Sequence, residues 1–193
     1  AQMNIDGSQD LVHCSTSLII SSSRISIRGV VRPNTALGSD PCVGVYTDGV
    51  YNTENGIFDY CNFCDIERIE VLRGPQGTLY GRNAVGGAIN VISKEPQREL
   101  GGYVNLEVGN DGYLVTQGQV TGPLGETFSA IATLSKMERD ALQENLAADV
   151  GDLNNRDRTY YSVTLKADWT ENFTSTLRYM NYDRSENPSP GYL

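Results

Sequence analysis

The sequence of 193 residues lacks several features that would each point to a familiar class of protein. No apolar run approaches the roughly 18 residues of a membrane-spanning helix, and the longest comparable stretch is SLII at residues 17–20. Basic residues are not in excess either, because 15 Lys and Arg stand against 24 Asp and Glu, a formal net charge of −9. Nucleic-acid binding needs a basic face, so we expect no nucleic-acid partner.

Histidine is nearly absent, since His13 is the only one in the chain. No nucleophile–base pair and no metal cluster stands out, which argues against an enzyme and leaves us with no catalytic residue to name. Residues 1–23 also lack the basic start and apolar core of a signal peptide. We therefore expect that such a segment has been removed, or that the chain begins inside a longer one.

Cysteine is scarce but its spacing is suggestive, because YCNFC at residues 60–64 has the C-x-x-C pattern. That pattern can mean a redox dithiol, half a zinc site or a tight disulfide. Zinc would need two further ligands, which only Cys14, Cys42 and His13 could supply. A redox pair would need a surrounding βαβ pattern, which is missing. A disulfide or unpaired buried thiols are the favoured interpretations, and we expect no metal site and no cofactor.

The segment IERIEVLRGPQGTLYGRNAVGGAINVIS, residues 66–93, joins an apolar–charged alternation to a run rich in glycine. The run lacks the Gly-Lys-Ser/Thr ending of a P-loop and the spacing G-x-G-x-x-G, which disfavours a phosphate-binding loop. Tight turns between sheet strands explain the glycines, because glycine lets the backbone turn sharply and approach its neighbours. They do not explain the charges.

The composition changes near Pro96, after which longer alternating segments are separated by turns such as NDG at residues 110–112, a strong hairpin signal. In TYYSVTLKADW, residues 159–169, alternation puts an apolar set on one face of a strand. That set is Tyr161, Val163, Leu165, Ala167 and Trp169. Phe173, Leu177 and Tyr179 share a face in the next segment. We expect about five such strands.

A strand of a soluble sandwich could alternate in the same way, but two details favour contact with lipid. Aromatic residues sit at strand ends, as in an interfacial girdle, and short turns near residues 122–126 and 170–172 contrast with a long polar connection at 140–157. Within that connection DLNNRD lacks the glycine and the terminal glutamate of an EF-hand loop. We interpret it as a solvated acidic loop.

Taken together, three stretches resemble the plug domain of TonB-dependent outer-membrane receptors: ISIRGV (25–30), VGVYTDGVY (43–51) and DIERIEVLRGPQGTLYGRNAVGGAINVISKEP (65–96). The resemblance covers roughly residues 17–193. It implies an α+β plug domain over residues 1–96, a small mixed sheet with short helices. Residues 97–193 would then be the first about five antiparallel strands of a transmembrane β-barrel.

Plugged barrels of this kind have about 22 strands, so the resemblance implies a barrel that is incomplete in this chain. The TonB-binding segment and the first plug strand would likewise precede Ala1. The implied function is active import across the outer membrane of a Gram-negative bacterium. Its partners would be TonB with its inner-membrane energising complex, outer-membrane lipid, and a scarce nutrient: a ferric siderophore first, otherwise cobalamin or a glycan.

The resemblance also implies residue roles. Plug loops that face outward would contact the ligand through Arg32, Asn34, Tyr51, Asn52 and Glu54. Polar contacts with the barrel wall would come from Glu67, Arg68, Glu70, Arg73 and Arg82, because the planar fork of arginine suits carboxylates. Any of these residues could instead be an ordinary solvated side chain.

Two other functions stay open at this point. The chain could belong to a receptor that passes a ligand signal inward through an extra N-terminal domain, which sequence before Ala1 would reveal. It could also belong to a structural or adhesive outer-membrane barrel without transport, which a measurement of energised uptake would separate from an importer.

Overall fold

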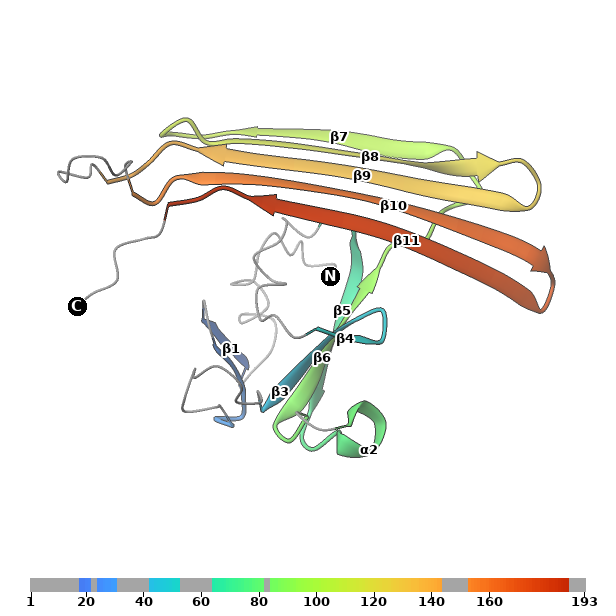
Figure 1. Ribbon diagram of the computed structural model, residues 1–193, viewed down its shortest axis with the longest axis horizontal. Helices are drawn as coiled ribbons and strands as arrows, with labels where there is room; N and C mark the ends of the chain where they lie inside the picture. Colours follow the sequence, from blue (N-terminus) through green and yellow to red (C-terminus); the bar gives the residue numbers. More distant parts are fainter. Residues whose placement is uncertain are drawn as a thin grey trace, which may run out of the picture. The chain divides into compact units, whose positions relative to one another are not determined.

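The computed structural model describes residues 18–21, 24–30, 42–52, 64–81, 84–143 and 153–187. The chain divides into two compact units, Ala1–Lys94 and Glu95–Leu193, and both are built mainly of strands (Figure 1). The described residues hold one short helix, α2 (Gly77–Tyr80). Within those same ranges, no helix has the length and apolarity needed to cross a membrane.

The first unit contains a four-stranded mixed sheet in the order β4–β3–β6–β5. Its central strands β3 (Val43–Thr47) and β6 (Gly87–Ser93) are parallel. The outer strands β4 (Val50–Asn52) and β5 (Ile66–Arg73) run antiparallel to their neighbours. A separate hairpin is formed by β1 (Leu18–Ser21) and β2 (Arg24–Ile27). This is the small mixed sheet that the sequence predicts for this part of the chain.

Both faces of the mixed sheet are packed. On one face, apolar residues of β3 and β6 meet the β1–β2 hairpin in a cluster of Leu18, Ile25, Ile27, Val43, Val45, Ile89 and Val91. On the other face Tyr46, Ala84 and Ala88 pack with Tyr51, Leu72 and Tyr80. A central strand covered on both faces loses the alternation of a half-exposed strand. In β6, accordingly, every residue except Ile92 is buried.

Gly87 lies where three strands of this sheet converge, because it pairs with Val43 on β3 and with Arg73 on β5. Its φ is +151°, and a Cβ there would lie 2.4 Å from the carbonyl oxygen of Leu72 and 2.8 Å from Cδ1 of Ile27. A backbone oxygen at that distance cannot move aside without disturbing the strand. At this position the glycine run does permit close strand approach, as the sequence suggests.

The β3–β4 turn is tied to the end of β6. Asp48 and Gly49 form the turn with φ values of 50° and 81°, the left-handed geometry of a two-residue hairpin loop. The backbone N–H of Asp48 donates to the carbonyl of Val91 at 2.9 Å, and its side chain accepts from the backbone N–H of Ser93 at 2.9 Å. The turn is thereby fixed to the neighbouring strand as well as to its own.

The second unit is an antiparallel five-stranded sheet in which strands adjacent in sequence are adjacent in space (Figure 1). Its strands are β7 (Gly101–Val108), β8 (Leu114–Leu124), β9 (Phe128–Arg139), β10 (Arg156–Thr170) and β11 (Phe173–Arg184). The predicted strands are present, but the loop predicted over 140–157 ends earlier. Arg156 and Asp157 already pair with Arg139 and Glu138, because the ladder between β9 and β10 extends to them.

The two faces of this second sheet have the reverse polarity of a soluble half-buried sheet. On β10, Ser162 and Thr164 are buried whereas Val163 between them is 47% exposed. On β9, Thr133 and Ser135 are buried whereas Leu134 is 52% exposed. We call the two sides the polar face and the apolar face. The exposed residues of the apolar face include Val104, Leu106, Val120, Leu134, Val163, Trp169, Phe173, Leu177 and Tyr179.

Replacing Gly87 by alanine should destabilise the first unit by about 1–3 kcal/mol, because the added methyl overpacks backbone and Ile27. Hydrogen exchange of the intact protein, read by mass spectrometry, should show faster exchange in β5 and β6 and no change in β9–β11. Gly77→Ala is the matched control, since a Cβ at the exposed Gly77 meets nothing within 4 Å. Equal protection in both variants would contradict the close-approach argument.

Candidate functional site

A row of polar and aromatic side chains crosses the mixed sheet of the first unit, with one residue from each strand. Tyr51 on β4 pairs with Tyr46 on β3, Tyr46 with Asn90 on β6, and Asn90 with Glu70 on β5. Paired positions on adjacent strands share a face of the sheet. The row therefore changes from aromatic to ionic along one surface.

The aromatic end of the row is a three-tyrosine cluster. The ring of Tyr46 lies 5.5 Å from that of Tyr51 and 4.6 Å from that of Tyr80, measured between centroids. Its hydroxyl donates to the backbone carbonyl of Tyr80 at 2.5 Å. Burial, and then the neighbouring Tyr51 and Tyr80, raise the pKa of Tyr46, so its hydroxyl is a neutral donor. The cluster holds α2 against the sheet.

The ionic end of the row is a network on β5. Arg68 Nε donates to Glu70 at 2.9 Å and Arg68 Nη1 to Glu67 at 2.9 Å, while Asn90 Nδ2 lies 3.4 Å from the other oxygen of Glu70. Glu67 and Arg68 can both face solvent because the β5–β6 register is irregular between Ile66 and Arg68, which interrupts the alternation. Hydrogen bonds from Arg68, and then from Asn90, lower the pKa of Glu70.

Three of the residues predicted to contact the barrel wall, Glu67, Arg68 and Glu70, are thus brought together by the structure, with Arg68 paired to both carboxylates. Arg73 is exposed at the end of β5. The predicted role of these residues in contacting a barrel stays a prediction. Arg82 lies outside the described residues.

The predicted ligand residues are less completely placed. Tyr51 and Asn52 are successive residues of β4, so they point to opposite faces of the sheet. Tyr51 packs on Tyr46, whereas Asn52 pairs with Val45. The structure does not bring the two to one surface, and their contact with a ligand stays a prediction. Arg32, Asn34 and Glu54 fall outside the described residues.

Two of the cysteines fall among the described residues, and both are in the thiol form. Cys64 is buried and Cys42 is partly buried, whereas Cys14, Cys61 and His13 lie outside the described residues. In the part of the chain that the structure describes, no group of three or more His, Cys, Asp or Glu side chains is arranged to hold a metal ion.

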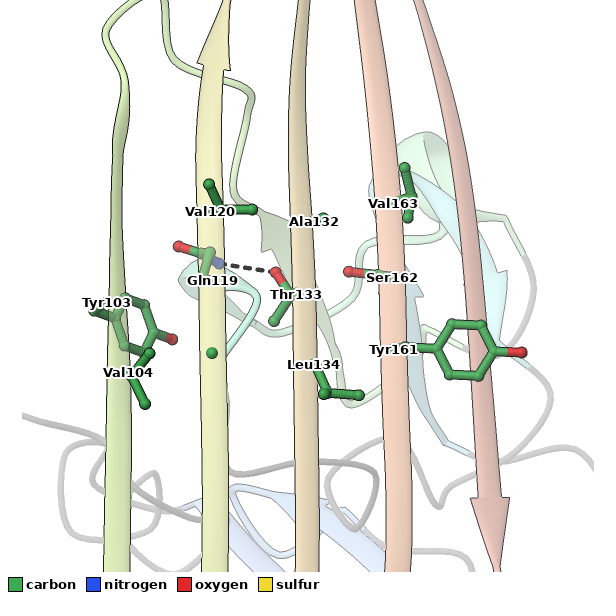
Figure 2. Close-up of a pocket in the computed structure, with 11 residues that line it drawn as sticks. Tyr103, Val104, Gln119, Val120, Ala132, Thr133, Leu134, Tyr161, Ser162 and Val163 are labelled. Carbon is green, nitrogen blue, oxygen red and sulfur yellow. Dashed lines mark hydrogen bonds between the residues drawn. The ribbon is translucent and has the colours of Figure 1, made fainter.

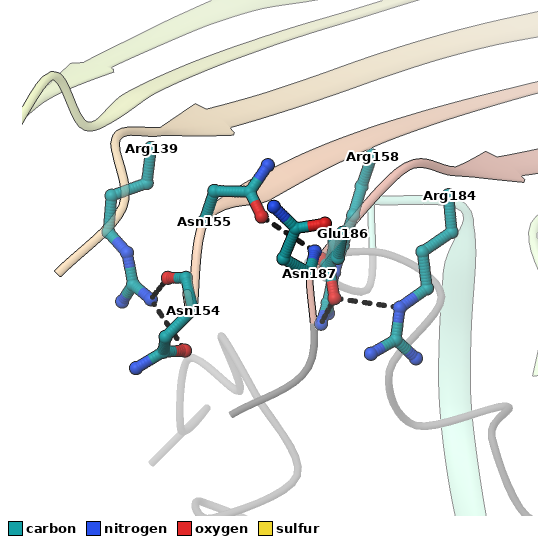
Figure 3. Close-up of polar contacts among 7 residues, drawn as sticks. All are labelled: Arg139, Asn154, Asn155, Arg158, Arg184, Glu186 and Asn187. Carbon is teal, nitrogen blue, oxygen red and sulfur yellow. Dashed lines mark hydrogen bonds and ion pairs between the residues drawn. The ribbon is translucent and has the colours of Figure 1, made fainter. Parts of the chain in front are cut away.

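A second polar site lies at one end of the five-stranded sheet (Figure 3). Arg158 on β10 is paired directly with Arg184 on β11, an arrangement in which like charges repel. Glu186 lies between them. Its carboxylate accepts from Nε of Arg158, from Nη2 of Arg158 at 3.2 Å and from Nε of Arg184 at 2.7 Å. The side chains of Arg158 and Glu186 are only 12% and 7% exposed.

Arg139 lies beside this triad at the end of β9. Its Nη2 donates to the carbonyl oxygen of Asn154 at 2.8 Å and to the side-chain oxygen of Asn154 at 3.2 Å. The Nε atom of Arg139 is buried and has no hydrogen-bond partner. Sequence reasoning missed this group, because it treated residues 140–157 as a solvated loop. The available signal was the spacing of Arg156 and Arg158, which puts both on one face of a strand.

The opposite end of the sheet, beside the short turns, carries an aromatic pair and two ion pairs. Phe128 and Trp169 meet edge to face with centroids 5.5 Å apart. Asp168 pairs with Arg98 and accepts from the hydroxyl of Thr174, and Lys166 pairs with Glu95. The two ends of the sheet therefore differ, with an aromatic pair at the turn end and an arginine-rich group at the other.

The middle of the sheet contains a shallow hollow of about 470 Å³ across strands β7 to β10, shown in Figure 2. Small residues at Gly118 and Ala132 help to form it, and Gln119 donates to Thr133 at 3.0 Å beside it. None of the described residues that line it is charged. It offers no group that would attract an ion.

Comparison with known proteins decides the family. The family model described as TonB-dependent Receptor Plug Domain matches residues 12–88, which include strands β3, β4 and β5 and the first two residues of β6. This chain belongs to the TonB-dependent receptors. The matched residues all lie within the first unit, and the resemblance drawn from the sequence is confirmed.

The relatives of this TonB-dependent receptor chain are much longer than the chain itself. The pesticin receptor of Yersinia pestis is 30% identical over 146 residues, which is 75% of this chain and 21% of the relative. The ferrioxamine B receptor of Salmonella typhimurium is 42% identical over 76 residues, covering 39% of this chain and 11% of the relative. The chain spans about a fifth or less of the curated relatives it matches.

Solved structures of such receptors share the fold. The ferric yersiniabactin uptake receptor FyuA from Yersinia pestis superposes with a TM-score of 0.69 at 27% identity, covering 84% of this chain and 27% of that one. The pyoverdine outer membrane receptor FpvA from Pseudomonas aeruginosa, bound to pyoverdine, gives a TM-score of 0.70 at 21% identity, covering 93% and 26%. Both likenesses extend well beyond the plug, into the strands of the second unit.

The Glu186 triad predicts an acid-sensitive stability. Burial opposes ionisation of Glu186, but hydrogen bonds from Arg158 and the charges of Arg158 and Arg184 outweigh it and lower its pKa. When the pKa of a carboxyl group is lower in the folded protein than in the unfolded chain, the group stabilises the fold at pH values above its pKa in the unfolded chain. This stabilisation is lost as the pH falls through the pKa that the group has in the folded protein. Thermal unfolding of the intact protein between about pH 6 and pH 3 should therefore show a fall in Tm that Glu186→Gln lacks.

At neutral pH the same variant should have the lower Tm, because the paired arginines then repel each other without a carboxylate between them. Glu107→Gln, at an exposed carboxylate on β7, is the matched control and should behave like the unaltered protein. Parallel Tm curves for Glu186→Gln and the unaltered protein would show that the triad does not stabilise the strand ends.

Proposed function

We propose that the chain is part of an outer-membrane importer in a Gram-negative bacterium, in which the first unit is the plug and the second unit is part of the wall of a transmembrane β-barrel. The importer binds a ferric siderophore outside the cell and releases it into the periplasm. The energy comes from the inner membrane through TonB, which acts on the plug.

The reversed polarity of the five-stranded sheet is the observation that carries this proposal. Lipid-facing and lumen-facing residues alternate in barrel strands, with apolar side chains outward and polar ones inward. The sheet has this pattern on neighbouring strands: Val163 and Leu134 are exposed, whereas Ser162, Thr164 and Thr133 are buried. A soluble sheet would bury the first pair and expose the others.

The two ends of the sheet are also consistent with a membrane-spanning sheet whose short turns face the periplasm. Phe128, Trp169 and Phe173 gather near the short turns, where an aromatic girdle meets the periplasmic interface in barrels of this type. The longer connection between β9 and β10 leaves from the other end, which would face the outside. The Arg158–Glu186–Arg184 triad lies at that outer end.

The ligand class is proposed from the names of the relatives. Of the proteins reported above, one relative is named for pesticin, and the others are named for ferrioxamine B, ferric yersiniabactin and pyoverdine. A catecholate siderophore receptor from Escherichia coli is also 31% identical over 139 residues. These names support a ferric siderophore as the ligand ahead of cobalamin or a glycan.

Uptake of radioactive iron presented as different siderophore complexes tests the proposal in a strain that lacks the receptor gene. Restoring the intact gene should restore uptake of at least one complex under iron limitation. Deleting TonB in the same strain should abolish uptake while leaving binding to whole cells intact. Uptake that is unchanged by loss of the receptor, or that persists without TonB, would overturn the proposed function.

Adjacent positions on β11 provide a test of the membrane orientation. Leu177 and Thr176 are both exposed but lie on the apolar and polar faces. Leu177→Arg should destabilise the membrane-inserted protein by about 2–4 kcal/mol if the site is near the bilayer midplane, whereas a charge on the lumen side costs little. The measurement is the fraction of intact receptor assembled in the outer membrane. Equal assembly of Leu177→Arg and Thr176→Arg would contradict the orientation.

A further inference from the structure

The chain is fastened on both sides of the point where its two units join. The first unit ends at Lys94 and the second begins at Glu95. Lys94 donates its backbone N–H to the carbonyl of Asp65 and its Nζ to the carbonyl of Cys64, both at 2.9 Å. The carboxylate of Glu95, the next residue, pairs with Nζ of Lys166 on β10 at 2.5 Å. Because consecutive Cα atoms are about 3.8 Å apart, there is no slack between the two attachments.

The segment after Glu95 is bonded to the next two strands of the five-stranded sheet. The backbone N–H of Gln97 donates to Oγ1 of Thr121 on β8 at 2.8 Å. That hydroxyl donates in turn to the carbonyl of Ala130 on β9 at 3.1 Å. A hydrogen-bonded chain thus runs from the joining segment across two strands of the second unit.

Arg98 extends the attachment to the turn between β8 and β9. Its Nη1 donates to the carbonyl of Glu126, and its Nη2 donates to the carbonyl of Thr127 at 3.3 Å and to the carboxylate of Asp168 at 2.5 Å. The hydroxyl of Thr174 on β11 donates to the other oxygen of Asp168 at 3.0 Å. We call residues 95–98, which make these contacts at the turn end of the sheet, the clasp.

The clasp is held by several contacts that are each modest. The side chains of Arg98 and Asp168 are 43% and 33% exposed, and an exposed ion pair contributes little by itself. The contacts act on one short segment, however, so a contact that opens is kept close to its partner by the others and closes again. Pro96, which is buried, also restricts the backbone of the clasp through its fixed φ.

We propose that the clasp fixes the C-terminal end of the plug to the barrel wall, so that force transmitted by TonB rearranges the plug about Lys94 and does not draw it away from the wall. The inference rests on the proposed function, because it concerns the step that TonB drives. It makes Glu95 and Arg98 positioning residues, which act on transport through the plug rather than through the ligand.

The fixed point reaches a defined part of the plug. Lys94 is bonded to the two residues that directly precede β5. Ser93, the last residue of β6, donates its backbone N–H to the carboxylate of Asp48 at 2.9 Å. We therefore expect β6 and the start of β5 to move least when TonB acts, and the passage for the ligand to form by movement of the rest of the plug.

Reversing one charge at a time tests whether the clasp is needed. Glu95→Lys and Lys166→Glu each place two like charges together, whereas the two substitutions combined restore an ion pair of opposite sense. The intact receptor is produced in cells that lack the receptor gene, with iron supplied as ferrioxamine B, ferric yersiniabactin and ferripyoverdine in turn. At equal amounts of assembled receptor, each single variant should bind the transported complex normally but take it up about threefold to tenfold more slowly. The double variant should recover uptake.

A second readout separates the proposed role from a merely structural one. If the clasp holds the plug at the wall against the pull of TonB, each single variant should admit a bulky glycopeptide antibiotic that the outer membrane normally excludes, but only in cells that have TonB. Lys136→Glu is the matched control, because it reverses an ion pair of the same kind and length, with Glu138, at the other end of the sheet. It should change neither uptake nor antibiotic sensitivity.

Locking the clasp tests whether it stays closed during transport. Glu95→Cys and Lys166→Cys are combined in a receptor whose native cysteines are serine, and a short dimaleimide bridges the two thiols. Uptake should be the same as in the unaltered receptor. Loss of uptake on bridging, an antibiotic leak that persists without TonB, or single variants that behave like the control would each overturn the clasp and leave the proposed import function standing. Failure to import any ferric complex would remove the proposed function, and this inference with it.

Discussion

The structure of the second unit depends on the two-residue repeat of its backbone. Each antiparallel strand sends successive side chains to opposite faces, and five strands in register keep most of the exposed apolar ones on one side. That side is exposed, and the hydrophobic effect disfavours contact between so much apolar surface and water. The apolar face therefore needs an apolar environment to cover it. Lipid is that environment in the proposed barrel wall, where the hydrogen bonds of the strands are satisfied between neighbours. The remaining features of the second unit, an aromatic pair at one end and a charged end opposite, follow from this placement.

The plug satisfies the ordinary rules of a small soluble sheet. Its central strands are buried on both faces, and glycine is used where strands approach closely, as at Gly87. Its charges are concentrated on the edge strand β5, where Arg68 is shared between Glu67 and Glu70. Exposed ion pairs contribute little to stability but keep an edge strand from pairing with other chains. In the proposed receptor, a plug with a small apolar core and a charged surface would suit a wet lumen and could shift there without exposing a large apolar area.

The sequence predicts the elements of both units because their signals are local. Alternation in TYYSVTLKADW identifies β10 and its apolar face, and NDG at residues 110–112 marks the hairpin of β7 and β8. The polar row Tyr51–Tyr46–Asn90–Glu70 is not predictable in this way, since it depends on register between strands far apart in the sequence. The group of arginines beside Glu186 could not be predicted from the sequence for the same reason. Arg139 and Arg184 become neighbours of Arg156 and Arg158 only when three strands pair, and Glu186 lies beyond the last of them.

Site-directed spin labelling of the intact receptor along residues 173–184 tests the central claim most directly, after its native cysteines have been replaced by serine. Collision rates with oxygen, which concentrates in lipid, and with a water-soluble nickel complex report the surroundings of each label. A lipid-facing strand should give oxygen maxima at odd positions such as Leu177 and Tyr179, with nickel accessibility out of phase at Thr174 and Thr176. Uniformly high nickel accessibility at odd and even positions alike would mean that the apolar face meets water, and would contradict the account of this sheet as a membrane wall.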